Sequence, residues 1–505
     1  MTELAALAGA LGAILALLGR PRLALAAGLF ALGVAEVALG SRLVPGGLAA
    51  KLGSTEGLLA LAVGLPALAA LAAVFVRWPA LVPPVVVAAA PFRLPFEFGA
   101  DNRLFIGLGE SGRLGRLVPL YAVVAGAGAA LAWRSLRGAE LPPLPRMLAA
   151  PAAALAALTI ASLLWAYDPA SAEERLAFFV LPFTALFAVV AHAPFRAWLP
   201  RVLALEAIVL ACLFAAVGLA EAVARELLFY DPKVAIANSY TSYFRVTSLF
   251  DDPSIYGRHL ALGIAVVVAA LWLGRVHFWL GAGLVAFLWA GLFFSYSQSS
   301  LVALALGVLV TSFLVADRRV RRAIGAAAVV VAVVGAVLLV LLLRQESADR
   351  VTSDRSELVS DTATVVGNHP AFGVGVASQP VATRDEVAGR GSPEAHVSHT
   401  APLTVAAELG LVGTLVYLVF LVGATWILAL ARRAHEPLGL ALVAAFVVLF
   451  VHSLTYGLFF EDPFTWCVLA IAASFVATTQ PVGHALRLGR FGVPDMKRAS
   501  VSRAR

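Results

Sequence analysis

Long apolar segments recur along the whole chain and constrain its fold more than any other feature. A helix needs about 17–25 mostly apolar residues to cross the ~30 Å hydrocarbon core of a bilayer. The candidate spans lie near 4–18, 23–40, 56–76, 80–91, 117–132, 148–166, 176–192, 200–222, 257–273, 277–295, 299–316, 322–343, 403–431, 437–454 and 463–480. These segments are continuously apolar, whereas barrel strands alternate, so helices are expected. The chain is predicted to be an all-α polytopic membrane protein with about 12–15 transmembrane helices.

Composition supports this class of protein. Hydrophobic residues make up 61% of the 505 residues and charged residues 13%, against about 25% charged in soluble proteins. The net charge of +7 comes largely from arginines in short loops between the apolar segments, so it indicates topology and not nucleic-acid binding. Cys212 and Cys467 lie within apolar segments, where inert buried thiols are expected.

Basic loops predict the orientation, since short loops rich in lysine and arginine stay in the cytoplasm. The loops 133–147, 317–322 ("DRRVRR") and 431–437 ("ARRAHEP") are of this kind. Four regions are expected: helices over 1–343, an extracytoplasmic loop at 344–402, C-terminal helices over 403–480, and a basic cytoplasmic tail at 481–505. The first region has outer loops near 92–116 and 223–256. Glycine, proline and apolar runs in 344–402 favour a folded loop over a linker.

Arginines collect in the predicted outer loops, Arg355 among them, and Arg245 and Arg258 stand out by their setting around the start of an apolar segment. The guanidinium is a permanently charged fork of donors that matches phosphate oxygens. If these side chains converge, they would bind a phosphate or pyrophosphate. The alternative is that each reaches to lipid headgroups or pairs with a nearby acid.

The stretch "HVSHTAPLTVAAELG" (396–410) places His399 and Glu408 at the start of an apolar segment. Histidine titrates near neutral pH and is a natural general base or acid. Glu408 would lie two helical turns into the span, where a carboxylate needs a partner, either an arginine or the histidine. A shared metal at His396 and His399 is not favoured, because no metal motif accompanies them. The adjacent acids Asp251 and Asp252 are weak evidence for a divalent ion.

Four stretches together resemble the O-antigen ligases and Wzy-type polymerases of bacteria. They are "RVTSLFDDPSIYGRHLA" (245–261), "SYSQSSLVALALG" (295–307), "RSELVSDTATVVGNHPAFGVGVA" (355–377) and "HTAPLTVAAELGLVGTL" (399–415). The likeness covers roughly 150–480. Thr400 replaces the usual asparagine after the family histidine, and Gln298 stands where an arginine is common.

The resemblance implies a GT-C-like membrane glycosyltransferase that moves a glycan from undecaprenyl pyrophosphate to a sugar hydroxyl on the periplasmic side of the inner membrane. Arg245 and Arg355 would hold the pyrophosphate, with Arg258 as a third candidate. His399 would take the acceptor's proton, and Glu408 would orient His399 or an arginine. No metal and no cofactor are implied, and the partners would be the lipid-linked donor, a glycan or lipid-linked acceptor, and the bilayer.

The alternatives differ in class. A polymerase and a ligase would share the donor and differ in the acceptor, and the sequence does not separate them. A transporter or flippase for polysaccharide or lipid-linked glycan would be expected to show inverted repeats and a midplane site. No matching halves are apparent, and the charges gather toward one face. A non-catalytic assembly partner would leave the arginines, His399 and Glu408 without a purpose.

Overall fold

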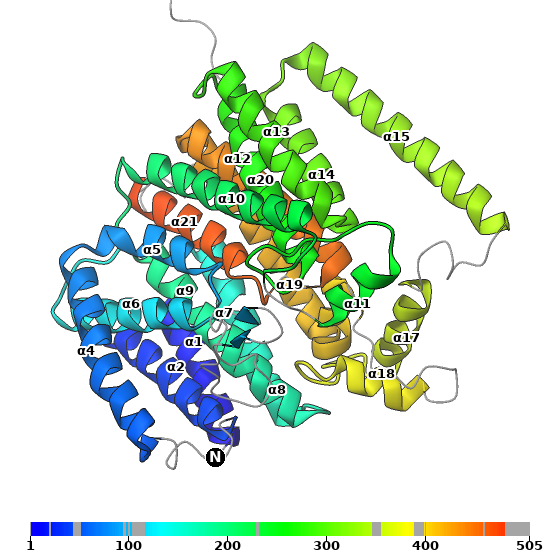
Figure 1. The fold of residues 1–505 in the computed structure, drawn as a ribbon. Coiled ribbons are helices and arrows are strands. Elements are labelled where there is room, and N and C mark those ends of the chain that lie inside the picture. The colour runs from blue at the N-terminus through cyan, green and yellow to red at the C-terminus, as the bar shows by residue number, and fades with distance from the viewer. Residues whose placement is uncertain are drawn as a thin grey trace, which may run out of the picture.

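The protein is described by a computed structural model, and it is a bundle of long helices (Figure 1). The structure describes residues 2–19, 22–43, 52–93, 97–98, 102–103, 117–228, 232–345, 355–387, 398, 400–457 and 460–479. The predicted all-α polytopic class is confirmed. Within the described ranges the one sheet pairs β1 (Glu97–Phe98) with β2 (Asn102–Arg103), two residues each.

The first half of the chain contributes helices that are apolar and close together. They are α1 (Thr2–Leu18), α2 (Arg22–Arg42), α4 (Thr55–Arg77), η1 (Pro79–Leu81), α5 (Val82–Ala89), α6 (Val118–Leu136), α7 (Arg146–Ala161), η2 (Ser162–Trp165), α8 (Pro169–Arg175), the π-helical turn η3 (Leu176–Val180), α9 (Leu181–Ala191) and α10 (Leu199–Ala224). Alanine is frequent among their buried residues. Small side chains let helix backbones approach closely, which favours packing within a membrane.

The second half carries most of the predicted motifs. Its helices are α11 (Pro232–Tyr240), α12 (Pro253–Trp272), α13 (Phe278–Ser295), α14 (Gln298–Val315), α15 (Arg318–Gln345), α17 (Arg355–Asn368), α18 (Gln379–Val387), α19 (Ala401–Ala434), α20 (Glu436–Tyr456) and α21 (Pro463–Thr479). Helix α20 contacts both α12 and α19, so it joins the two helices with the functional motifs. Helix α15 lies apart at the edge of the bundle (Figure 1).

Ten described helices are long and apolar enough to cross a membrane. This number is below the expected 12–15, partly because three other apolar stretches, Thr2–Leu18, Pro79–Ala89 and Pro463–Thr479, form helices of only 10–17 residues. The predicted loop at 344–402 contains α17 and α18, which pack against each other. Asn368 and His369 both contact the Glu386 carboxylate, at 2.7 Å and 2.8 Å, and tie the end of α17 to α18.

Three Asp–Pro pairs begin helices whose first residues lie near the candidate site. Asp168 accepts a hydrogen bond from the Ser171 amide at the start of α8. Asp252 does the same for the first amides of α12, and Asp462 accepts from the Phe464 amide at the start of α21. A carboxylate at this position caps the free amides and suits the positive end of the helix dipole, while proline fits the first turn.

Helix α19 is interrupted at Gly410, whose φ of 64° and ψ of −161° are not helical. The turn at 370–375 pairs with the backbone groups that this break exposes. The amides of Leu411 and Val412 donate to the carbonyls of Pro370 and Ala371, at 2.8 Å and 3.2 Å. The amides of Val374 and Gly375 donate to the carbonyls of residues 407 and 408, at 2.9 Å and 2.8 Å. Irregular backbone is tolerated at a membrane helix when protein satisfies its polar groups in this way.

The same turn is also held from the opposite side, by residues between α7 and α8. The amide of Tyr167 donates to the carbonyl of Val374 at 2.8 Å, and the amide of Val376 donates to Ser162 Oγ at 3.0 Å. The Tyr167 hydroxyl lies 3.4 Å from an Asp385 carboxylate oxygen, whose negative charge raises the pKa of Tyr167. The turn is therefore clamped between two parts of the bundle that are about 245 residues apart in sequence.

Candidate active site

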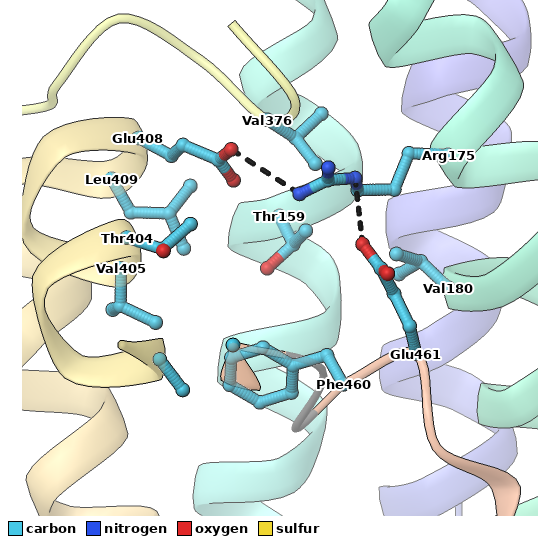
Figure 2. A pocket seen from close by; sticks show the side chains of 12 residues that line it. Thr159, Arg175, Val180, Val376, Thr404, Val405, Glu408, Leu409, Phe460 and Glu461 are labelled. Atoms are coloured by element: carbon cyan, nitrogen blue, oxygen red, sulfur yellow. Dashed lines mark hydrogen bonds and ion pairs between the residues drawn. The ribbon is translucent and has the colours of Figure 1, made fainter. Parts of the chain in front are cut away.

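A small pocket, with a cavity volume of about 40 Å³, lies beside the start of α19. Its wall combines apolar side chains with three charged ones, and it is lined by Thr159, Arg175, Val180, Val376, Ala401, Thr404, Val405, Glu408, Leu409, Gly457, Phe460 and Glu461. Figure 2 shows these side chains converging from α7, α8, α19 and the turn before α21. An apolar concavity with a few converging polar groups is the usual form of a ligand or active site.

Arg175 lies between two carboxylates in this pocket (Figure 2). Its Nη1 is 3.3 Å from Glu408 Oε1, and its Nε is 2.9 Å from Glu461 Oε1. The side chains are 26% exposed for Arg175, 8% for Glu408 and 16% for Glu461, so the group is largely shielded from water. Such shielding makes each ion pair stronger, and makes each charge costly when its partner is lost.

A second ion pair continues this group of charges. Arg258 Nη1 lies 3.0 Å from Asp462 Oδ2, with the two side chains only 5% and 2% exposed. Because Glu461 and Asp462 are adjacent, one short segment before α21 is held to α8 by one acid and to α12 by the other. Arg258 was predicted as a third pyrophosphate ligand, but the structure places it in this buried pair and not in the wall of the pocket.

Arg245 is presented by an irregular segment between α11 and α12. The Asn238 side chain holds its backbone, accepting from the Arg245 amide and donating to the Arg245 carbonyl, both at 2.9 Å. Its Nε donates to the Ser295 carbonyl at 3.4 Å. Among the described residues, the Arg245 guanidinium has no acidic partner within ion-pair distance. A guanidinium without such a partner in this part of the chain suits the binding of an anion.

Glu221 in α10 fixes the segment that carries Arg245. Its buried carboxylate accepts hydrogen bonds from the amides of Leu228, Thr247 and Ser248, at 2.8 Å, 2.9 Å and 2.7 Å. Ser248 has a φ of 54°, an uncommon value for a residue other than glycine. The three hydrogen bonds offset the cost of this conformation and hold the segment in one arrangement.

Glu221→Ala is therefore expected to lower the free energy of unfolding by about 3 kcal/mol, since three amides would lose a charge-assisted acceptor. Thermal unfolding in detergent would measure this change. Glu226→Ala is the matched control, because Glu226 is exposed in the same connection and should have little effect. An equal melting temperature for the two variants would contradict the role of Glu221.

Arg355 and His399 are less fully described. Arg355 is the first residue of α17, and His399 lies outside the described residues. Its neighbours Ser398 and Thr400 are described: Thr400 precedes α19, and the Ser398 hydroxyl contacts Thr404 Oγ1 at 2.5 Å. Thr404 and Ala401 line the pocket, so the chain enters α19 at this pocket.

The acids weighed for a divalent ion have other roles. Asp251 lies 2.9 Å from Arg93 Nη1, and Asp252 caps α12. In the part of the chain that the structure describes, no three histidine, cysteine, aspartate or glutamate side chains are grouped to hold a metal ion.

Four residues of this region were not predicted from the sequence: Arg175, Glu221, Glu461 and Asp462. The sequence does contain a pattern that could have drawn attention to Asp462: "FEDPF" (460–464) repeats the acid–acid–proline order of "FDDPS" (250–254). Arg175 also had a signal, since it follows "YDPASAEE" (167–174) directly before a long apolar segment. Neither pattern indicates which side chains meet, because the partners come from distant parts of the chain.

Residues 282–418 match the family model for O-antigen ligases. This region contains α14, α17, α18, the clamped turn and the first half of α19, and so it includes three of the four stretches that carry the resemblance. Residues 282–418 are therefore similar to the O-antigen ligases, and the match is confined to these residues. No curated protein matches the chain.

Proposed function

We propose that this protein is a membrane glycosyltransferase of the O-antigen ligase or polymerase type. It would move a glycan from undecaprenyl pyrophosphate to a sugar hydroxyl on the extracytoplasmic side of a bacterial inner membrane. The observation that carries the proposal is the shielded pocket at the start of α19, where Arg175 holds Glu408 and Ala401, the first residue of the helix, lines the wall. The family match over 282–418 supports the same class of reaction.

In this reaction the acceptor oxygen forms a bond to the sugar C1 while the bond from C1 to the pyrophosphate oxygen breaks. The acceptor hydroxyl gives its proton to His399, and the pyrophosphate leaves with added negative charge. Arg245 and Arg355 would bind that pyrophosphate. Fixed guanidinium groups in a water-poor site stabilise such a charge without reorganising, so a metal ion would not be required.

Glu408 would act by orienting a neighbouring side chain. Of the two roles left open by the sequence, pairing with an arginine is supported by the contact to Arg175. The Arg175 side chain holds Glu408 in one direction, and the carboxylate can then orient His399 when the imidazole gains a proton. Arg258 is assigned to the segment before α21, through its pair with Asp462.

The proposed sidedness rests on the basic loops. The ends of α6, α14 and α19 opposite the pocket carry the arginine-rich stretches 133–147, 317–322 and 431–437. Those loops are expected in the cytoplasm, so the pocket would open on the other side. There the sugars are in water, while the lipid carrier stays in the bilayer.

Glycan transfer by purified protein in nanodiscs tests the proposal, with undecaprenyl-pyrophosphate oligosaccharide as donor and EDTA present. Wild-type protein is expected to transfer glycan, and Arg245→Ala, Arg355→Ala and His399→Ala are each expected to lose at least about 100-fold of the rate, as for removal of an oxyanion-type or general-base group. The product would also separate a polymerase from a ligase.

Arg433→Ala is the matched control, because Arg433 is exposed at the opposite end of α19. Its rate should equal that of wild type. Normal transfer by folded His399→Ala and Arg245→Ala would show that these residues are misassigned. No transfer by folded wild type with any acceptor would favour the transporter, which a flux measurement in proteoliposomes would then examine.

A further inference from the structure

Two tyrosines form a closely packed, tilted pair beside Arg245. The ring centroids of Tyr243 and Tyr296 are 4.6 Å apart, and the ring planes are inclined by 33°. Tyr243 is 42% exposed, so part of its ring is open to a ligand. Tyr296 ends α13 with a φ of 49°, which is strained for a bulky side chain. Strain of this kind is often kept where the side chain serves a function.

The pair is adjacent to the Arg245 guanidinium. Tyr243 contacts the ring of Tyr296, and Arg245 Nε donates to the carbonyl of the preceding residue, Ser295. Both side chains thus reach the same end of α13. Gln298, the exposed first residue of α14, follows two positions after Tyr296 and offers an uncharged amide. An aromatic face, a cation and an amide therefore occur within one small region.

We propose that Tyr243 and Tyr296 form the binding surface for the sugar that is attached directly to the pyrophosphate of the donor. This inference rests on the proposed function. A pyranose has one face of C–H groups, which an aromatic ring can cover, and an edge of hydroxyls, which amide groups can bind. The sugar and the phosphate share one bond, so a sugar beside phosphate-binding Arg245 must lie within reach of the neighbouring rings.

An interfacial aromatic belt is the main alternative, since tyrosine and tryptophan are common at membrane surfaces. Trp279, at the other end of α13, fits that description: it is 75% exposed, and its one described ring contact is with Phe278. The Tyr243–Tyr296 pair differs, because its two rings pack against each other beside Arg245, which has no acidic partner among the described residues. A belt residue would bind lipid regardless of any sugar.

Binding to two lipids separates these explanations. Wild type, Tyr243→Leu, Tyr243→Phe and Trp279→Leu in nanodiscs would each be titrated with undecaprenyl pyrophosphate and with the same lipid carrying one sugar. We expect wild type to bind the sugar-bearing lipid more tightly. Tyr243→Leu should weaken that lipid alone, by roughly three- to tenfold, as for loss of one aromatic contact. Tyr243→Phe keeps the ring and should bind like wild type, as should Trp279→Leu.

The other outcomes are equally informative. If Tyr243→Leu weakens both lipids equally, the rings bind the carrier and the sugar assignment is wrong. If folded Tyr243→Leu binds both lipids like wild type, or if the sugar adds nothing to wild-type affinity, the inference fails while the proposed function stands. If folded wild type binds neither lipid, the proposed function fails and this inference fails with it.

Discussion

Gly410→Ala is expected to prevent most of the protein from folding stably, which is the largest effect expected of any single substitution. A Cβ at this position would lie 2.4 Å from the carbonyl carbon and oxygen of Ala371 and 2.6 Å from the Phe372 amide nitrogen. These are backbone atoms that cannot turn aside. The φ of 64° adds strain for any L side chain. Strain and overpacking each cost about 1–3 kcal/mol, a large part of a total stability of about 5–15 kcal/mol.

The destabilisation of Gly410→Ala would arise where α19 packs against the turn at 370–375. Moving either backbone to relieve the contact breaks hydrogen bonds that satisfy amides and carbonyls at the helix break, and water cannot replace them at membrane depth. Glu408 would move with this backbone, since its carbonyl accepts from the Gly375 amide. We therefore expect aggregated or severely destabilised protein, as measured by size-exclusion chromatography and thermal unfolding in detergent.

Gly367→Ala is the matched control. Gly367 lies in α17, a few residues before the same turn, and an added Cβ there would meet no atom within 4 Å. Alanine is the better helix former, so this variant should be as stable as wild type or slightly more stable. If Gly410→Ala melts at the wild-type temperature, the close packing of the two backbones is wrong.

Arg175→Met is expected to cause the second largest effect, and it acts on both stability and activity. It leaves the carboxylates of Glu408 and Glu461 in the pocket without their cation. Removing one partner of a buried pair costs about 3–5 kcal/mol, and the 26% exposure of Arg175 favours about 3 kcal/mol, the lower end of that range. Glycan transfer should also fall at least about 100-fold, because Glu408 would lose its fixed direction.

Two further variants test whether unpaired charge causes the destabilisation of Arg175→Met. Adding Glu408→Gln to Arg175→Met removes one unpaired charge, so it should restore part of the melting temperature without restoring transfer. Arg384→Met is the control for an exposed pair: Arg384 and Asp385 are 45% and 39% exposed, and their loss should cost less than about 1 kcal/mol. Folded Arg175→Met with wild-type transfer would contradict the proposed role of Arg175.

The helical class and the regions that matter could be predicted without the structure. Continuous apolar runs permit little besides membrane helices, because every backbone polar group must be satisfied within the bilayer. The motif at 399–415 also pointed to Glu408 as a buried acid in need of a partner. The number of spans was less predictable, since apolar runs of similar composition became either full-length or shorter helices, depending on what they pack against.

The partner of Glu408 was beyond prediction from sequence. Arg175 precedes it by 233 positions and ends α8, a segment that carried no family motif. For Arg258, the position in the fold could be predicted although its partner could not. The sequence correctly placed it within the first turns of α12, where a lipid-facing charge is unfavourable. Only the tertiary structure decided that its partner would be Asp462, in a buried ion pair.

The amino-acid sequence by itself determined a polytopic helical protein and where its charged side chains enter the helices. These properties follow from local composition and from the cost of exposing polar groups to lipid. The tertiary structure alone decided that α19 breaks at Gly410 to admit the turn at 370–375, and that Arg175 lies between two acids. Both depend on segments brought together across the bundle, where packing sets which side chains and backbone groups meet.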